Sequence, residues 1–230
     1  MPQAALADIG ACIFDAYGTL LDVHSAMARH AARIGPDWQA LSLAWRQKQI
    51  EYSLVRSLSG PAQHRDFATL TDEALAFVAA SRGIDDAALL ADLARAYRSL
   101  AAHPEVPAML SALRDRGIAR AILSNGAPAM LAEGVAAAGI ADLLDDVLSV
   151  EAVGVFKPDP RVYALAGQRF GLPASRMAFM SSNSWDAFGA RNFGFRVVWI
   201  NRHGQPDEYG LRGTVVELRD LSGLPGVLAA

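Results

Sequence analysis

The chain of 230 residues predicts an α/β fold, a doubly wound parallel sheet that carries an inserted all-helical domain. From His103 onward, short apolar runs alternate with amphipathic stretches, and this spacing favours repeated strand–helix units around a parallel sheet. Between the first apolar run and His103, only helical periodicity is present, over about eighty residues. A block of helices that follows the first strand indicates a separate small domain, a cap over one end of the sheet.

The first strand is the apolar run from Ile9 to Phe14, broken only by Gly10. Such a run is typical of a buried parallel strand. It ends in a carboxylate, Asp15, and the turn that follows contains Gly18, which can take a positive φ. Open α/β sheets bind ligands at the carboxyl ends of their strands, so Asp15 is a candidate functional residue. Taken alone, an aspartate here could equally cap the turn.

The inserted cap is predicted to span residues 23–102, and the core domain is predicted to span residues 1–22 and 103–230. Breaks at Gly35-Pro36-Asp37 and Ser59-Gly60-Pro61 separate the first helices of the cap. The helices of the cap are expected at Ser25–Ile34, Trp38–Leu58, Phe67–Ala80 and Asp86–Leu100.

The core domain alternates strands with helices. Its strands are expected at Ile118–Leu123, Val147–Val150, Met177–Ser181 and Arg196–Ile200. Its helices are expected at Val106–Arg116, between Pro128 and Gly139, and at Pro160–Phe170 and Trp185–Phe193. The segment Leu218–Leu228 predicts a weak terminal helix, because Gly223 and Pro225 interrupt it.

The composition indicates a globular protein, with 52% hydrophobic residues and a formal net charge of −3. No basic patch suggests nucleic acid, and no apolar run is long enough to span a membrane, so neither is an expected partner. The single cysteine, Cys12, lies in the first strand and is expected to pack there. The segment Met1 to Asp8 has no basic residue before its apolar part, unlike a signal peptide, so a cytoplasmic location is expected.

Polar groups follow several of the predicted strands: Ser124 with Asn125, Lys157, and the stretch from Ser181 to Asp186. Each has an ordinary explanation as a turn residue, a surface lysine or a helix cap. Their joint order after Asp15 suggests more, because strand ends in a doubly wound sheet converge on one crevice. The scattered histidines are not expected to be catalytic: His24, His30, His64, His103 and His203. No nucleophile elbow, P-loop or dinucleotide-binding motif is present.

This order resembles the four-motif signature of the haloacid dehalogenase superfamily, over the chain from Ile13 to about Asn201. The resemblance implies a haloacid dehalogenase-like fold with a Rossmannoid core. The first motif of the superfamily, Asp-x-Asp-Gly-Thr, here reads Asp15-Ala16-Tyr17-Gly18-Thr19. Tyr17 stands where the phosphatases carry a general acid, and tyrosine, with an unperturbed pKa of about 10, is a poor substitute.

The sequence is therefore similar to the branch that cleaves carbon–halogen bonds, the (S)-2-haloacid dehalogenases. Five motifs carry this finer resemblance: Phe14-Asp15-Ala16-Tyr17-Gly18-Thr19-Leu20, Trp45-Arg46-Gln47-Lys48-Gln49, Leu123-Ser124-Asn125-Gly126, Lys157-Pro158-Asp159-Pro160-Arg161-Val162-Tyr163 and Ser181-Ser182-Asn183-Ser184-Trp185-Asp186. The last motif offers serine and asparagine where the phosphatases have a carboxylate that binds magnesium. No metal site and no cofactor are therefore expected.

The resemblance implies that Asp15 displaces the halide in one step, with inversion at C2, and forms an ester that water then hydrolyses. Lys157 would be the counter-ion of Asp15, assisted by Thr19 and Tyr163. The carboxylate of the substrate would be held by Ser124 and by backbone N–H groups of the turn after Asp15.

In the second step, Asp186, with Asn183 and Ser181, would position and deprotonate the water. Arg46 on the cap is the implied cation for the departing halide, because its guanidinium is permanently charged. The other implied contacts of substrate and halide are Ala16, Tyr17, Gln47, Ile50, Phe67, Ser124, Asn125, Lys157, Asn183 and Trp185.

The expected partners are a small 2-haloacid and halide, and family resemblance with the apolar cap helices suggests a homodimer. Three alternatives stay open at this point. They are a magnesium phosphatase on the same fold, a hydrolase of another small 2-substituted acid such as a strained cyclic amino acid, and a helical interaction module on an inactive scaffold.

Overall fold

The computed structural model describes residues 6–229. Its centre is a six-stranded parallel sheet with the strand order β3-β2-β1-β4-β5-β6. The strands are β1 (Ala11–Phe14), β2 (Ala119–Ser124), β3 (Asp146–Ser149), β4 (Met177–Ser181), β5 (Arg196–Ile200) and β6 (Val216–Leu218). The predicted doubly wound parallel sheet is therefore confirmed. The segment Met1 to Asp8, read as unlike a signal peptide, falls largely outside the described residues, as do residues 1–5 of the predicted core domain and residue 230.

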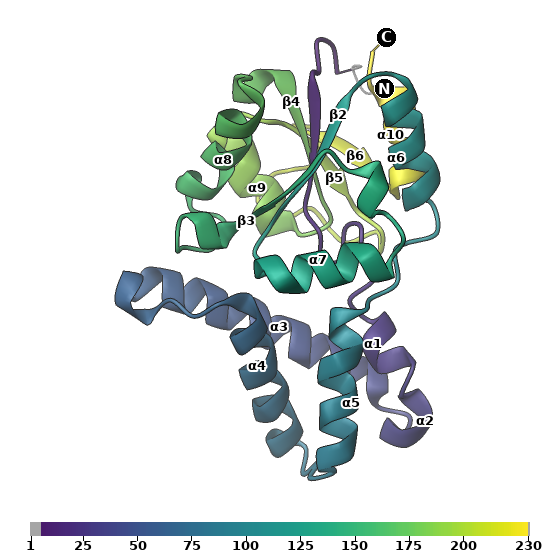
Figure 1. Cartoon of the computed structure of the whole chain (residues 1–230), viewed down its shortest axis with the longest axis vertical. Coiled ribbons are helices and arrows are strands. Elements are labelled where there is room, and N and C mark those ends of the chain that lie inside the picture. The colour runs from purple at the N-terminus through teal and green to yellow at the C-terminus, as the bar shows by residue number, and fades with distance from the viewer. Residues whose placement is uncertain (1–5, 230) are drawn as a thin grey trace.

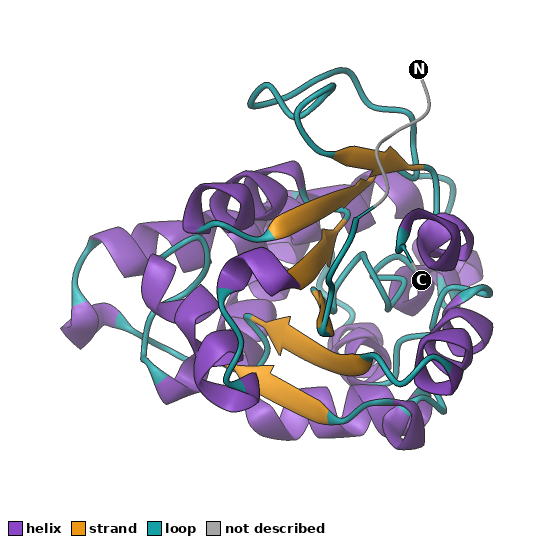
Figure 2. Ribbon diagram, turned by 90° about the horizontal axis from the view of Figure 1, so that it is seen from above, coloured by secondary structure: helices purple, strands orange, loops and turns teal. Residues whose placement is uncertain are grey.

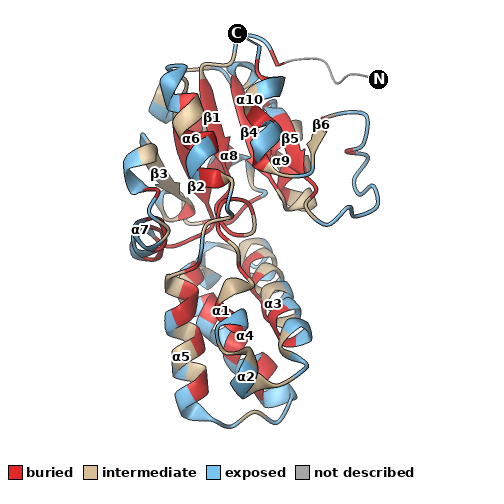
Figure 3. Cartoon of the chain, turned by 90° about the vertical axis from the view of Figure 1, so that its right-hand side faces the viewer, coloured by how far each residue is buried: buried red, intermediate tan, exposed pale blue. Residues whose placement is uncertain are grey.

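The order of strands reverses between β1 and β4. Strands β1, β2 and β3 succeed one another in one direction, and β4, β5 and β6 in the other. At the carboxyl end of β1, Phe14 pairs with Ile122 of β2 and with Met180 of β4. All of β1 is buried, as Figure 3 shows, because it is covered on both faces. Crevices that bind ligands in such sheets lie at this reversal, directly beyond β1.

Helices cover both faces of the sheet (Figures 1 and 2). Helices α6 and α10 pack together on one side, and α8 and α9 pack together on the other (Figure 1). The bounds are α6 (Val106–Asp115), α7 (Pro128–Ala137), α8 (Pro160–Phe170), α9 (Ser184–Phe193) and α10 (Leu224–Val227). Short 3₁₀ turns lie at η1 (Pro61–Gln63), η2 (Ala141–Leu143), η3 (Val150–Ala152), η4 (Ala174–Arg176) and η5 (Leu221–Gly223).

The remaining helices form a block below the sheet (Figure 1). They are α1 (Ser25–Ala28), α2 (Ala31–Ile34), α3 (Trp38–Leu58), α4 (Phe67–Ser81) and α5 (Ala87–Arg98). The helix expected at 25–34 is in fact two short helices separated by a turn. Ala26 and Met27 of α1 are buried, whereas no residue of α2 is buried. Because α2 has no packed face, nothing holds the two short helices together as one continuous helix.

The end of the chain also differs from the prediction. A sixth strand, β6, begins at Val216, and the expected terminal helix is reduced to one turn, α10. Gly223 and Pro225 prevent a longer helix, and the short β6 is held at the sheet edge by pairing with β5.

Two neighbouring segments connect the helical block, residues 25–98, to the sheet. Leu21 and Ala102 form an antiparallel bridge. The backbone N–H of Asp22 donates to Ala101 O at 2.8 Å, and that of His103 donates to Leu20 O at 3.0 Å. The domain boundaries at residues 22/23 and 102/103 stay a prediction. Within the described residues, no helix combines the length and the apolar character that crossing a membrane requires.

Candidate active site

The carboxylate of Asp15 lies at the carboxyl end of β1, where only 6% of the residue is exposed. Its Oδ2 accepts hydrogen bonds from Thr19 Oγ1 at 3.1 Å and from Asn183 Nδ2 at 2.8 Å. Its Oδ1 lies 3.2 Å from Nζ of Lys157. The Ser182 N–H donates to Thr19 Oγ1 at 2.9 Å, which leaves the hydroxyl proton of Thr19 free for Asp15. The sequence therefore places a carboxylate among three donors.

Lys157 joins two buried carboxylates. Its Nζ lies 3.2 Å from Asp15 and 3.0 Å from Oδ2 of Asp186, and neither Lys157 nor Asp186 is exposed. Tyr163 donates to Asp186 Oδ1 at 2.8 Å. Burial raises the pKa of Asp186 to about 6; the charge of Lys157 opposes this rise and the charge of Asp15 adds to it. Burial also raises the pKa of Tyr163 well above its ordinary value, so this phenol stays a donor.

Arg46 reaches from α3 to the core. Its Nη2 donates to the backbone oxygen of Tyr17 at 3.1 Å and lies 3.4 Å from Asn183 Oδ1. Its Nη1 lies 3.4 Å from Oε1 of Gln49. Asn183 also donates to the Tyr17 oxygen, at 3.2 Å. A permanent cation from the helical block thus shares one polar partner, Asn183, with Asp15.

Aromatic rings form an apolar wall beside these groups. The ring centroid of Tyr17 lies 5.6 Å from that of Phe67 and 5.7 Å from that of Tyr97, on which it stacks. The Phe67 ring in turn lies 6.3 Å from that of Phe156. The hydroxyl of Tyr17 is buried and has no hydrogen-bond partner within residues 6–229. Burial raises the pKa of Tyr17 well above its ordinary value, so the wall stays uncharged.

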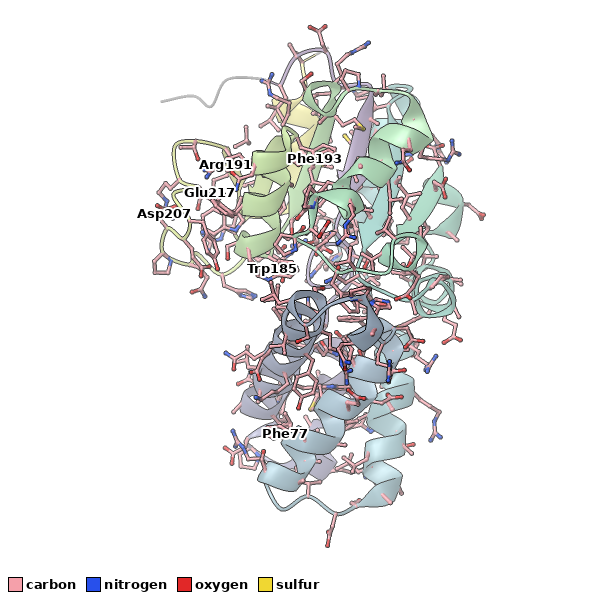
Figure 4. The ribbon with its side chains drawn as sticks, turned by 90° about the vertical axis from the view of Figure 1, so that its left-hand side faces the viewer. Phe77, Trp185, Arg191, Phe193, Asp207 and Glu217 are labelled. Carbon is pink, nitrogen blue, oxygen red and sulfur yellow. The ribbon has the colours of Figure 1, made fainter. Side chains whose placement is uncertain are left out.

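Three other residues were predicted to contact the substrate or the halide, and they differ in how deeply they are buried. Trp185 lies where α9 meets the helical block, and its Nε1 is buried without a partner in the described part of the chain (Figure 4). Ile50 is partly buried on α3. Gln47, on the same helix, is exposed and makes no side-chain hydrogen bond to another described residue. The structure brings Arg46 close to Asp15, through their shared partner Asn183. A role for Gln47 in binding substrate or halide stays a prediction.

The predicted residues at the ends of β2 and β4 make hydrogen bonds to the backbone of nearby loops. Asn125 Oδ1 accepts the backbone N–H of Lys157 at 2.9 Å. Ser181 Oγ accepts that of Asn183 at 3.1 Å. Ser124 is fully buried and its Oγ accepts the N–H of Gly126 at 3.1 Å, while its own proton has no acceptor among the described residues. Side chains from the ends of β2 and β4 therefore fix the backbones that carry the lysine and the asparagine.

Two details differ from the predicted arrangement. Asn183 contacts Asp15 directly and not Asp186, because the turn after β4 points its amide at β1. Tyr163 contacts Asp186 and not Asp15. The turn geometry that decides both contacts is not readable from residue spacing.

Two buried polar residues were not predicted as site residues: Gln49, named only as part of a motif, and Tyr97. They bond to each other at 2.9 Å beside Arg46. Gln49 could have been found, since a residue three positions after Arg46 lies on the same helix face. No local signal marks Tyr97, which comes from α5. In the described residues, no group of three or more His, Cys, Asp or Glu side chains is arranged to hold a metal ion.

Comparisons with known proteins agree with this geometry. Residues 9–194 match the family of haloacid dehalogenase-like hydrolases. The (S)-2-haloacid dehalogenase 4A of Burkholderia cepacia is 44% identical, covering 95% of this chain and 94% of that protein. The (S)-2-haloacid dehalogenase of Pseudomonas sp. (strain YL) is 47% identical, covering 83% and 82%.

Solved structures resemble this one over nearly all of its length. A dehalogenase with an intermediate complex has a TM-score of 0.94 at 43% identity, covering 97% of this chain and 99% of that one. L-2-haloacid dehalogenase from Xanthobacter autotrophicus with chloropropionic acid covalently bound has a TM-score of 0.83 at 36% identity, covering 95% and 98%. The chain therefore belongs to the haloacid dehalogenase-like hydrolases and, within them, to the (S)-2-haloacid dehalogenases.

Proposed function

We propose that this enzyme hydrolyses short-chain (S)-2-haloalkanoic acids to (R)-2-hydroxyalkanoic acids and halide, through an ester on Asp15. The observation that carries the proposal is the environment of that carboxylate. It is almost fully buried, fixed by Lys157, Thr19 and Asn183, and close to a cation from the helical block. A carboxylate shielded from bulk water is a stronger nucleophile toward carbon than a solvated one.

The two oxygens of Asp15 differ in their partners, and this difference suggests how they divide the chemistry. Oδ1 has one donor, Lys157, whereas Oδ2 has two, Thr19 and Asn183. With a single partner, Oδ1 has more of its lone-pair directions open to the substrate than Oδ2, so we propose that Oδ1 is the attacking atom. Attack by Oδ1 leaves Oδ2 as the ester carbonyl oxygen. The two donors on Oδ2 would then stabilise the oxyanion that forms during hydrolysis of the ester.

Arg46 would bind the departing halide, with the rings of Tyr17 and Phe67 as apolar walls. A planar guanidinium has five N–H donors, so it can keep its contacts to Tyr17 O and Asn183 while others face the halide. The proton of Ser124 Oγ, and the N–H groups of Ala16 and Tyr17, have no acceptor among the described residues. These donors would hold the carboxylate of the substrate.

Asp186 would take the proton of the attacking water. It is buried, and it shares Lys157 with Asp15. Formation of the ester removes the charge of Asp15, which is one of the causes that raise the pKa of Asp186. Asp186 is therefore more fully ionised at the step where a base is needed.

The helical block would act as a cap, residues 23–102, that closes the pocket. The contacts that support this role join it to the core: Arg46 with Tyr17 O, and Ser57 Oγ with the Phe156 N–H at 3.1 Å. A homodimer is proposed from the large apolar side chains exposed on the outer surface of the block: Leu43, Val55, Leu58 and Phe77. A cytoplasmic location stays a prediction.

The test is a screen of both enantiomers of 2-chloropropionate with chiral analysis of the product. The proposal expects turnover of the (S)-enantiomer alone, with (R)-lactate as product. Turnover of the (R)-enantiomer, retention at C2, or hydrolysis of phosphate esters in place of haloacids would contradict it.

A further inference from the structure

Gln49 is fully buried on α3, three residues after Arg46. Its Oε1 accepts a hydrogen bond from the hydroxyl of Tyr97 at 2.9 Å and lies 3.4 Å from Nη1 of Arg46. Its Nε2 lies 3.3 Å from Oγ1 of Thr71 on α4. A buried amide whose polar atoms all have partners is held in one place, and one of these partners is the cation beside Asp15.

A backbone carbonyl decides which way this amide points. Thr71 Oγ1 donates its single proton to Phe67 O at 2.7 Å. Toward Gln49 it can therefore only accept, so Nε2 faces Thr71 and Oε1 faces Arg46. The reverse orientation would oppose the NH₂ group to the guanidinium, and both Arg46 Nη1 and the buried Tyr97 hydroxyl would lose Oε1 as their acceptor.

Tyr97 adds a second link to the site. Its ring stacks on Tyr17 at 5.7 Å, with 19° between the planes, and lies 4.8 Å from that of Trp45. Burial raises the pKa of Tyr97 above its ordinary value, so its hydroxyl stays a donor to Gln49. One residue of α5 therefore contacts both the acceptor of Arg46 and the residue two positions after the nucleophile.

We propose that Gln49 and Tyr97 are positioning residues that fix the Arg46 guanidinium for the departing halide. This inference rests on the proposed function, in which Arg46 binds the halide. A long arginine side chain has many rotamers, and ordering it only when the halide forms would raise the barrier. The buried acceptor orders it beforehand, and the direction of the Gln49 amide is set by Thr71 and Phe67.

The test compares Tyr97→Phe, Thr71→Val and the conservative Thr71→Ser with wild type. Tyr97→Phe keeps the ring on Tyr17 and removes only the donor to Gln49. Tyr52→Phe is the matched control, because Tyr52 lies on α3 and makes no side-chain hydrogen bond among the described residues. Single-turnover halide release is measured with 2-chloropropionate and 2-bromopropionate, and bromide affinity is measured by calorimetry.

Tyr97→Phe and Thr71→Val should slow halide release about three- to tenfold, as expected for one lost orienting hydrogen bond. The loss should be greater for the chloro than for the bromo substrate, because the poorer leaving group depends more on the cation. Bromide affinity should fall in parallel, the rate of ester hydrolysis should be unchanged, and Thr71→Ser should recover what Thr71→Val loses.

Equal chloride release and equal bromide affinity in wild type and Tyr97→Phe would overturn the inference, as would equal losses in Tyr52→Phe. A wild-type enzyme inactive on both haloacids would instead overturn the proposed function. In that case bromide titration still decides the inference, because it needs no turnover: weaker binding in Tyr97→Phe supports it and unchanged binding refutes it.

Discussion

The ammonium group of Lys157 lies 3.0 Å from the carboxylate of Asp186, and neither residue is exposed to solvent. The same nitrogen lies 3.2 Å from Asp15. One cation thus serves two carboxylates that the proposed mechanism uses in succession. When the first becomes an ester, the cation stays with the second.

Lys157→Met should abolish turnover and reduce the free energy of unfolding by about 3–5 kcal/mol at pH 8, because it leaves buried carboxylates unpaired. Removing Lys157 removes the charge that lowers the pKa of Asp186, so this carboxyl binds its proton more tightly in the folded than in the unfolded state. The folded variant is therefore stabilised as the pH falls, and its deficit in the free energy of unfolding relative to wild type should shrink toward pH 5.

Urea unfolding of the variant and of wild type at pH 8 and pH 5 measures this deficit. The control is Lys48→Met, at a partly exposed lysine on α3. A deficit that grows on acidification would contradict the pairing.

Arg46→Lys should not restore the rate lost in Arg46→Ala. A compact ammonium cannot reproduce a planar fork that contacts Tyr17 O, Asn183 and Gln49 together. Both variants should release halide about a hundredfold more slowly in single turnovers. Wild-type rates in Arg46→Ala would remove this residue from the site.

Ester hydrolysis should lose rate as the pH falls, because a proton on Asp186 prevents it from acting as a base. The pKa of Asp186 is raised to about 6, in part by the charge of Asp15. That charge is absent in the ester, so the inflection for hydrolysis should lie below pH 6. Rapid-quench measurements between pH 4 and 8 would show it. An inflection well above 6, or one that persists in Asp186→Asn, would assign the titration to another group.

Exhaustive chelation should leave dehalogenation unchanged. The phosphatase alternative requires a divalent cation, whereas Tyr17 and the serines of the last motif offer no carboxylate to bind one. Activity is assayed after prolonged dialysis against chelator, with and without added magnesium. A loss that magnesium alone reverses would support the phosphatase.

Most of the fold could be predicted because its elements have clear local signals. The helices at 38–58 and 160–170 and the strands at 177–181 and 196–200 end where glycine, proline or a change of periodicity indicates. The strand β6 was missed because three residues at a sheet edge are stabilised by pairing with β5 and not by their own pattern. The break between α1 and α2 likewise depends on tertiary burial.

The part of the site that could be predicted consists of residues that follow the ends of strands. Asp15, Lys157 and Asp186 are joined in the structure as their order in the chain suggested. The contact of Asn183 with Asp15 and the Gln49–Tyr97 pair were not predictable. They depend on one turn and on how three helices of the block pack, and neither is encoded in local spacing.

The covalent role of Asp15 is tested most directly by a single turnover in heavy-oxygen water with enzyme in excess. Attack by Asp15 forms an ester, and water then adds to the ester carbonyl carbon. Heavy oxygen should therefore enter the peptide containing Asp15, and the product hydroxyl should stay unlabelled. Labelled product with an unlabelled Asp15 peptide would show direct attack by water and would contradict the account.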